Sequence, residues 1–158
     1  METPQQTQNF ADLLVVGGGA SGLTMALAAA QAGFRVALAD GGALDDAIRP
    51  DARSYAIAPA SMLLFSALGL GERMNAAAQP VRRMAIADAP PAQLNKSLIR
   101  LGFNEDDAVS GPESPLAFII ESRHILGTLM DAVRAEPRIT RAAKSALTAI
   151  EQIPGAIR

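Results

Sequence analysis

Short apolar runs and one run of small residues predict a strand, a helix and a second strand near the start of the chain. Residues 12–16 are nearly all apolar, which is typical of a strand buried on both faces. Residues 20–32 are small helix formers, and Gly33 follows where a helix end favours glycine. Residues 35–40 again have strand character. Two strands joined by a helix within about 30 residues predict a parallel βαβ crossover.

Beyond this unit the pattern of apolar positions is less regular. Residues 41–52 contain glycine, aspartate and proline and are predicted to form a loop. A helix is predicted over residues 60–68, between Pro59 and Gly69. Further strands are predicted from apolar runs bounded by charged or turn-forming residues, at 81–88, 98–103 and 116–120.

The last long helix is predicted over residues 123–135, with Ser122 as its N-terminal cap. Its apolar residues recur at helical spacing and share one face: Ile125, Leu126, Leu129, Met130 and Val133. We expect residues 153–158 to form a turn that leads into another strand. The pattern predicts an α/β fold of the Rossmann type, with a parallel sheet and additional strands. Residues 1–10 are expected to be a disordered arm and residues 11–158 one domain.

Composition limits the chemistry that the side chains can supply. The 158 residues are 49% hydrophobic and 19% charged with a formal net charge of −2, which suits a globular domain. They lack the excess of cations that nucleic-acid binding requires. The chain has no cysteine and a single histidine, His124, so metal sites and histidine-assisted nucleophiles are hard to build. We therefore expect no metal, and expect His124 to be a packing or surface residue.

Residues 13–34 carry no charge and are long enough to cross a bilayer, which takes about 20 residues. Glycines interrupt this stretch. A secretory signal has a lysine or arginine before its apolar segment, and here neither residue precedes the stretch. We therefore predict a buried strand–loop–helix unit without a transmembrane segment, in a cytoplasmic protein.

Residues 17–22 match the G-x-G-x-x-G pattern of dinucleotide-binding loops, as Gly17, Gly18, Gly19, Ala20, Ser21 and Gly22. In that pattern the first glycine allows the tight turn, the second lets a pyrophosphate approach the backbone, and the third lets helix and strand pack closely. The N-terminus of the following helix offers N–H groups and a partial positive charge to the diphosphate.

Asp40 ends the second predicted strand, about 20 residues beyond the loop, where a carboxylate can accept hydrogen bonds from an adenosine ribose. Together the loop and Asp40 predict dinucleotide binding. A Walker A loop is disfavoured because Leu23 stands at its lysine position. A short-chain dehydrogenase is disfavoured because Tyr55, the only tyrosine, is followed by Pro59 where that family has lysine.

Two later segments resemble the flavin-dependent aromatic hydroxylases of the p-hydroxybenzoate hydroxylase superfamily. Residues 51–58 read Asp-Ala-Arg-Ser-Tyr-Ala-Ile-Ala and resemble the family's Arg-[Ser/Thr]-x-Ala-[Leu/Ile] stretch. Residues 118–126 read Phe-Ile-Ile-Glu-Ser-Arg-His-Ile-Leu and resemble the Glu-Asn-Arg-x-Leu segment of the ubiquinone-biosynthesis hydroxylases in that superfamily. Asp40 stands where the family usually has glutamate, and Ser122 where it has asparagine.

The resemblance implies a Rossmann-like FAD domain in which Arg53 and Arg123 help to hold the flavin nucleotide, since guanidinium groups bind phosphate and carbonyl oxygens. It implies a monooxygenase that uses FAD, NAD(P)H and O2 to hydroxylate a small aromatic substrate, a polyprenylated phenol of ubiquinone biosynthesis. It also implies contact with the inner membrane from the cytoplasmic side, or with a ubiquinone-biosynthesis complex. No catalytic residue can be assigned.

Members of this family are longer, with a later Gly-Asp segment at the flavin and a β-sheet domain over the substrate. The chain is therefore expected to be the N-terminal part of such an enzyme and to bind FAD weakly at best by itself. Two alternatives stay open. One is an NAD-binding module of a dehydrogenase, which shares the loop and Asp40 but does not need the two arginines. The other is a non-catalytic dinucleotide-binding remnant.

Overall fold

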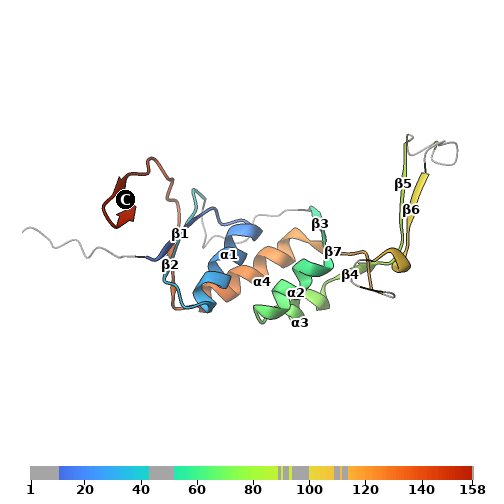
Figure 1. Ribbon diagram of the computed structural model, residues 1–158, viewed down its shortest axis with the longest axis horizontal. Coiled ribbons are helices and arrows are strands. Elements are labelled where there is room, and N and C mark those ends of the chain that lie inside the picture. Colours follow the sequence, from blue (N-terminus) through green and yellow to red (C-terminus); the bar gives the residue numbers. More distant parts are fainter. Residues whose placement is uncertain are drawn as a thin grey trace, which may run out of the picture. The chain divides into compact units, whose positions relative to one another are not determined.

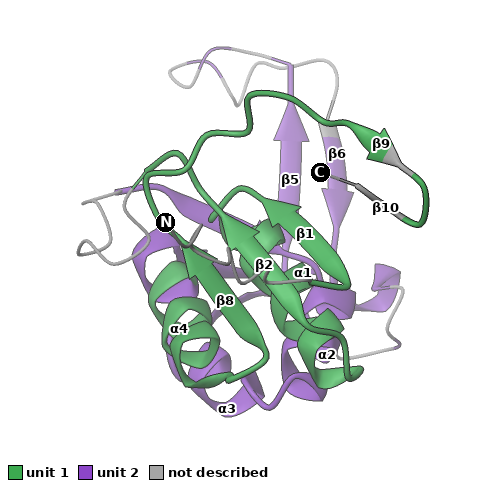
Figure 2. Ribbon diagram, turned by 90° about the vertical axis from the view of Figure 1, so that its left-hand side faces the viewer, with its two compact units in different colours: residues 1–49, 126–158 green, residues 50–125 purple. Residues whose placement is uncertain are grey.

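The computed structural model describes residues 11–42, 52–88, 90, 93, 100–108, 111 and 114–157. The chain forms two compact units, one of residues 1–49 and 126–158 and the other of residues 50–125, coloured separately in Figure 2. The second unit is thus inserted in the sequence between two parts of the first. The predicted arm at residues 1–10 and most of the predicted loop at 41–52 lie outside the described residues.

The first unit contains a parallel sheet of β1 (Leu13–Val16), β2 (Val36–Ala39) and β8 (Ile139–Ala142), in the order β1-β2-β8. Helix α1 (Ala20–Gln31) connects β1 to β2 and contacts the sheet (Figure 1). The predicted parallel βαβ crossover is therefore confirmed, and the uncharged stretch at residues 13–34 folds as a strand, a loop and a helix. Within the described ranges, no helix is long and apolar enough to cross a membrane.

The two faces of this sheet differ in burial. Val15 is in register with Leu38, and both side chains are buried. Leu14 and Val16 point to the opposite face, because neighbouring residues of a strand alternate, and they are 50% and 52% exposed. The expectation that the first strand is buried on both faces is therefore wrong for this chain. Its sequence is apolar on both sides, but only the face that carries Val15 is covered.

An ion pair joins the starts of β1 and β2. The Arg35 backbone N–H donates to Asp12 Oδ2 at 2.8 Å, and its guanidinium donates to Asp12 Oδ1 at 2.9 Å. These hydrogen bonds favour the charged carboxylate and lower the pKa of Asp12 from 3.8 to about 2. The pair is open to solvent, with side-chain exposures of 62% for Arg35 and 38% for Asp12.

The second unit contains an antiparallel sheet in which β7 (Ala117–Glu121) lies between β3 (Ser54–Ile57) and β4 (Gln79–Val81). Helices α2 (Pro59–Ala67) and α3 (Gly71–Ala76) follow β3. The predicted helix after Pro59 is confirmed, and its residues Met62 and Phe65 are buried. Helix α3 was not predicted, because so short a segment has no apolar period to recognise.

The single strand predicted over residues 81–88 is two strands in the structure. β4 ends at Val81, and β5 (Met84–Ala87) begins after Arg82 and Arg83. The strands have different partners, since β4 pairs with β7 whereas β5 pairs with β6 (Arg100–Phe103). Arg82 forms an ion pair with Glu105 of the short 3-10 helix η2 (Glu105–Asp107), which follows β6. The change of partner explains why Val81 and residues 84–87 belong to different strands.

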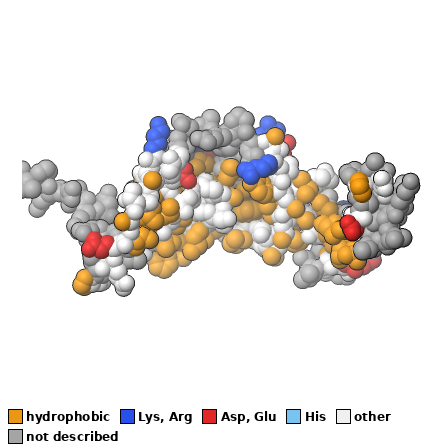
Figure 3. Space-filling model, turned by 90° about the horizontal axis from the view of Figure 1, so that it is seen from above, with side chains coloured by type: hydrophobic (Ala, Val, Ile, Leu, Met, Phe, Trp, Pro, Cys, Tyr) orange, Lys and Arg blue, Asp and Glu red, His pale blue; other side chains and the backbone are white. Residues whose placement is uncertain are grey.

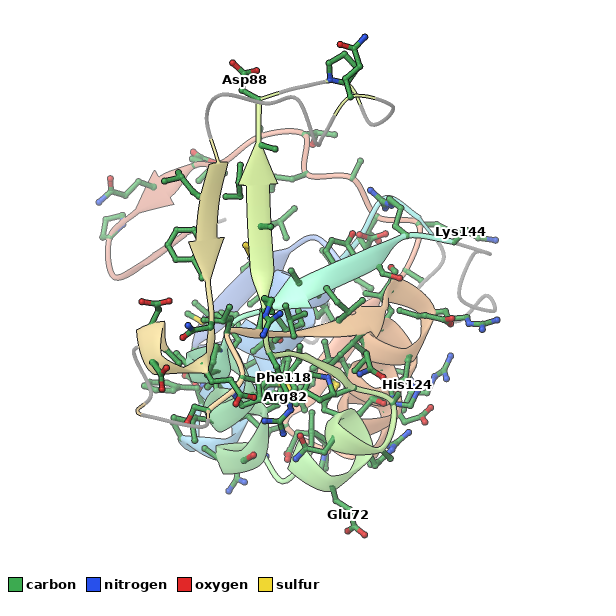
Figure 4. All side chains as sticks on the ribbon, turned by 90° about the vertical axis from the view of Figure 1, so that its right-hand side faces the viewer. Glu72, Arg82, Asp88, Phe118, His124 and Lys144 are labelled. Carbon is green, nitrogen blue, oxygen red and sulfur yellow. The ribbon has the colours of Figure 1, made fainter. Side chains whose placement is uncertain are left out.

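Strands β5 and β6 carry large apolar side chains on one face. Met84 is opposite Phe103, and Ile86 is opposite Leu101. All four are more than a third exposed. Apolar side chains are also visible on the molecular surface in Figure 3. The charged residue Asp88 lies at the end of β5, as Figure 4 shows.

Helix α4 (Ser122–Ala135) begins in the second unit and continues into the first. Ile125, Leu129 and Val133 are buried, which confirms the predicted apolar face. The predicted cap is wrong, because Ser122 is the first helical residue and its hydroxyl is buried without a hydrogen-bond partner. The Ser122 N–H instead donates to the Arg53 carbonyl at 2.8 Å, so the pairing of β3 with β7 continues up to the start of the helix.

The last described segment forms a small antiparallel hairpin of β9 (Gln152–Ile153) and β10 (Ala156–Ile157). The predicted turn that leads into another strand is confirmed there, at Pro154 and Gly155.

Candidate functional site

The glycine loop lies between the end of β1 and the start of α1. Gly17 has a φ of +114°, a backbone conformation that side-chain-bearing residues rarely adopt. Its N–H donates to the Ala39 carbonyl at 2.7 Å, which attaches the turn to the end of β2. The sharp reversal from strand to helix therefore depends on glycine at this position.

Gly22 allows α1 to pack directly against this turn. A Cβ atom at position 22 would lie 1.9 Å from the Gly17 carbonyl oxygen and 3.6 Å from Val15 Cγ1. The first of these distances is far below van der Waals contact, and the atom that it meets belongs to the backbone. The third glycine of the motif therefore has the packing role predicted for it, between helix and strand.

Gly19 and the first turn of α1 remain open. Gly19 is the N-cap residue, it is exposed, and a Cβ atom added there would meet nothing within 4 Å. No side chain caps the helix, and its first turn has no acidic residue. The first helical hydrogen bond runs from Leu23 N to Gly19 O at 2.9 Å, so the N–H groups of Ala20 and Ser21 have no acceptor within the helix. This end can receive an anionic group.

Asp40 lies beside the same loop. Its Oδ2 accepts a hydrogen bond from Gly18 N at 2.6 Å, and its Oδ1 accepts one from Gly42 N at 2.7 Å. A carboxylate has about four acceptor positions, so both oxygens can accept further hydrogen bonds from a bound sugar. The structure thus brings the loop and Asp40 together, as their predicted roles require, and adds a direct bond between them that the sequence did not indicate.

The segment after β8 completes this edge of the sheet. Ser145 N donates to the Asp40 carbonyl at 2.9 Å, and Lys144 N donates to the Gly42 carbonyl at 2.8 Å. Lys144 has a φ of 55°, in the left-handed region, and its side chain is labelled in Figure 4. Our sequence prediction missed this segment because β8 follows the whole inserted unit. The available signal was weak, because β8 reads Ile-Thr-Arg-Ala and only its first and last residues are apolar.

Arg53 precedes β3 in the second unit, and its guanidinium carbon lies 5.8 Å from the centre of the Tyr55 ring. That distance is within the range of a cation–π interaction. The carbonyl of Arg53 accepts the hydrogen bond from Ser122 described above, which places Arg53 next to the start of α4. Arg53 and Arg123 therefore come from neighbouring segments of one unit, as their common role would require.

Arg123 lies at the exposed start of α4, and its Nε donates to Glu121 in an ion pair. This carboxylate accounts for a cation at a helix N-terminus, where the helix dipole alone would disfavour it. A hollow of about 510 Å³ is lined by Arg123, Glu121, Ala77 and His124. His124 Nε2 is 2.8 Å from the Arg73 carbonyl of α3. The expectation that His124 is a packing or surface residue stays a prediction.

The site residues thus fall into two groups. The loop and Asp40 belong to the first unit, and both arginines belong to the second. Among the described residues, no cluster of His, Cys, Asp or Glu could hold a metal ion. The open helix end and the exposed backbone at Gly19 fit a diphosphate, and Asp40 fits a sugar with neighbouring hydroxyl groups.

Comparisons with known proteins agree with this geometry. A family model described as an FAD binding domain matches residues 11–152. The ubiquinone hydroxylase UbiL of Rhodospirillum rubrum is 27% identical over 144 residues, which is 90% of this chain and 31% of UbiL. The chain thus spans about a third of the length of this curated relative.

Solved structures show the same fold. p-Nitrophenol 4-monooxygenase PnpA from Pseudomonas putida DLL-E4 superposes with a TM-score of 0.73 and 18% identity, over 92% of this chain and 34% of PnpA. The flavin-dependent monooxygenase PieE, solved in complex with FAD and substrate, gives a TM-score of 0.69 and 19% identity, over 93% of this chain and 26% of PieE. The α/β fold with a parallel sheet corresponds to a minor part of each of these chains.

Proposed function

Because the chain belongs to the FAD-binding domain family, we propose that its glycine loop, Asp40, Arg53 and Arg123 hold FAD. The observation that carries the proposal is the position of Asp40, whose carboxylate is hydrogen-bonded to Gly18 at the open end of α1. The N–H donors that would bind a diphosphate and the carboxylate that would accept hydrogen bonds from a sugar therefore lie side by side at one edge of the parallel sheet. Ligands of open α/β sheets bind at the carboxyl ends of the strands, which is where both groups lie.

In this proposal the start of α1, Gly19 and Asp40 have distinct roles. The N–H groups of the first turn of α1 receive the pyrophosphate, and the partial positive charge of the helix end stabilises it. Gly19 leaves the backbone accessible, since a Cβ atom added at this position would meet nothing within 4 Å. Asp40 accepts hydrogen bonds from the ribose of the adenosine half. Its negative charge would repel a phosphate on that sugar, so the site suits FAD rather than NADP.

Arg53 and Arg123 are proposed to bind oxygen atoms of the flavin nucleotide. Guanidinium groups present several N–H donors in a planar arrangement that matches phosphate and carbonyl oxygens. Arg123 is 69% exposed in its ion pair with Glu121 and can bind an added anion without losing a buried partner. An NAD-binding module would share the loop and Asp40 but would not need these two arginines.

Titration of the purified chain separates FAD binding from the NAD alternative. We expect the flavin fluorescence of FAD to be quenched when FAD binds to the chain. The fluorescence of NADH measures NADH binding in the same way, and we expect that binding to be weaker. Substitution of either arginine by alanine is expected to weaken FAD binding only. Tighter binding of NADH than of FAD, unaffected by the arginine substitutions, would support the dehydrogenase module.

We further propose that the protein takes part in hydroxylation of a polyprenylated phenol in ubiquinone biosynthesis. The relative UbiL, which carries the name ubiquinone hydroxylase, and the monooxygenases that share the fold support this proposal. When bound, FAD would take up two electrons from NAD(P)H and enable O2 to place one oxygen atom on the ring and release the other as water. The residues of this chain would bind and orient the cofactor.

Isotope labelling tests the hydroxylation. The protein is supplied with FAD, NADH or NADPH, a polyprenylated phenol and labelled O2, and the phenol is examined by mass spectrometry. Incorporation of one labelled oxygen atom per molecule would support the proposal. Oxidation of NAD(P)H that yields only hydrogen peroxide with every phenol would contradict it. FAD binding without any NAD(P)H oxidation would fit both the non-catalytic remnant and the N-terminal part of a longer enzyme.

A polyprenylated substrate is dissolved in the membrane, so we propose a cytoplasmic protein that contacts the inner membrane peripherally or joins a complex of ubiquinone biosynthesis. Flotation with phospholipid vesicles, with and without a polyprenylated phenol in the bilayer, tests the membrane contact. Flotation of the protein with the vesicles only when the phenol is present would support recognition of the substrate at the membrane surface.

A further inference from the structure

We infer that Tyr55 is a positioning residue that holds the Arg53 guanidinium ready for the cofactor. The guanidinium carbon lies 5.8 Å from the ring centre, and cations within about 6 Å are attracted to the face of an aromatic ring. This role rests on the proposed function of Arg53 in holding FAD. It concerns how the arginine is oriented and adds no new contact between Tyr55 and the cofactor.

The backbone on both sides of this contact is fixed. The Arg53 carbonyl accepts a hydrogen bond from Ser122 N at 2.8 Å, and Tyr55 is in register with Ile120 of β7. Ile120 is buried, so β7 is anchored in the unit. Residues two apart in an extended strand point to the same side, which places the ring beside the guanidinium.

The ring is 41% exposed, so a large part of it faces solvent. An arginine side chain has several rotatable bonds, and it loses conformational entropy when it binds an anion. A neighbouring ring that already restricts the guanidinium reduces that loss and so strengthens binding. The motif that contains Arg53 leaves the position of Tyr55 open to any residue. The pairing is therefore a property of this chain and does not follow from the motif.

The composition of the chain supplies a direct measurement. Tyr55 is the single tyrosine and the chain has no tryptophan, so its tyrosine fluorescence comes from this ring alone. We expect Arg53→Ala to change the tyrosine emission, because the substitution removes the cation from the ring. We also expect FAD titration to change the emission with the same dissociation constant as the flavin signal. Unchanged emission in Arg53→Ala would show that the two side chains do not interact in solution.

Affinity measurements test the consequence for FAD. Tyr55→Leu removes the ring and is expected to raise the FAD dissociation constant by about two- to fivefold, as the strength of an exposed cation–π contact implies. Tyr55→Phe keeps the ring face and is expected to bind like the unsubstituted chain. In the Arg53→Ala background, Tyr55→Leu is expected to have no further effect. Phe34→Leu, which removes an exposed ring in the first unit, serves as the matched control.

The outcomes separate this inference from the proposed function. If Arg53→Ala binds FAD as well as the unsubstituted chain, Arg53 does not hold the cofactor, and both the proposal for Arg53 and the role of Tyr55 are wrong. If Arg53→Ala weakens binding while Tyr55→Leu does not, or if their effects are additive, the proposed function stands and the role of Tyr55 is wrong. Circular dichroism of each variant confirms that a loss of affinity does not come from unfolding.

Discussion

The Asp40 carboxylate accepts a hydrogen bond from the Gly18 N–H at 2.6 Å, and this bond joins the end of β2 to the loop that follows β1. The same carboxylate also accepts the N–H of Gly42. Asp40 therefore fixes the backbone on both sides of the proposed sugar site before any ligand binds. The same Asp40 carboxylate thus serves both the proposed ribose contact and the structure of the loop.

Replacement of Asp40 by asparagine should therefore affect both binding and stability. The amide oxygen can accept only some of the hydrogen bonds, and it carries no charge to strengthen them. Hydrogen bonds to charged groups contribute about 1.5–3 kcal/mol, so we expect the FAD dissociation constant to rise by at least about tenfold. Flavin fluorescence titration measures the change. Asp12→Asn, at a carboxylate before the start of β1 and so at the other end of this strand from the loop, is the matched control, and an equal effect of the two substitutions would contradict the role of Asp40.

Replacement of Gly22 by alanine should act mainly on folding. The added Cβ atom would lie 1.9 Å from the Gly17 carbonyl oxygen, so helix and turn must move apart. Overpacking of this kind typically costs about 1–3 kcal/mol of the free energy of unfolding. Urea unfolding followed by circular dichroism measures this loss. A fully stable Gly22→Ala variant would show that the close approach of helix and turn is not required.

Replacement of Gly19 by alanine should have the opposite profile. The new Cβ atom meets nothing within 4 Å, and the backbone at this position is already extended, so the free energy of unfolding should fall by less than about 1 kcal/mol. The same methyl group would stand where the pyrophosphate approaches the backbone, and FAD affinity should fall strongly. Comparison of unfolding and titration for Gly19→Ala and Gly22→Ala therefore separates binding from packing. Unchanged FAD affinity in Gly19→Ala would place the diphosphate elsewhere.

Local patterns predicted the parts of the fold and site that are close together in sequence. The βαβ unit, the glycine loop and Asp40 lie within about 30 residues, and each has a local signature of apolar runs, glycine spacing or strand end. Helix α4 was predicted for the same reason, since its buried face repeats along one continuous segment.

The features that sequence reasoning missed depend on contacts between distant segments. β8 joins the parallel sheet only after the inserted unit, so nothing near Ile139 in the sequence shows that its neighbour is β2. The division of residues 81–88 follows from the partners of β4 and β5, which lie in later segments. The hydrogen bond of Asp40 to Gly18 and the contact of Arg53 with Tyr55 are likewise properties of the folded backbone.

Neighbouring valines of β1 provide a test of the one-sided burial of the sheet. Val15 is buried, whereas Val16 is 52% exposed. Val15→Thr would place a hydroxyl group in the core and should lower the free energy of unfolding by about 1–3 kcal/mol. Val16→Thr keeps a β-branched side chain at an exposed position and should change it by less than about 0.5 kcal/mol. Equal losses in the two variants, measured by urea unfolding, would show that both faces are buried.

The ion pair between Asp12 and Arg35 predicts a specific pH dependence of stability. Because the pair lowers the pKa of Asp12 from 3.8 to about 2 in the folded chain, the unfolded chain binds this proton at a higher pH than the folded chain does. The stabilisation is therefore fully present above the unfolded pKa. It is lost as the pH falls from about 4 towards 2, where the folded carboxylate also becomes protonated.

Asp12→Asn removes this titration and isolates its contribution. The difference in free energy of unfolding between the original chain and Asp12→Asn should be constant near neutral pH, decrease below pH 4 and reach its low-pH limit near pH 2. Since both side chains are exposed, the difference at neutral pH should be small and should decrease further in about 1 M salt, which screens exposed charges. Urea unfolding of both chains across this pH range measures it. A difference that grows as the pH falls would have the wrong sign and would show that Arg35 does not stabilise the charged form of Asp12.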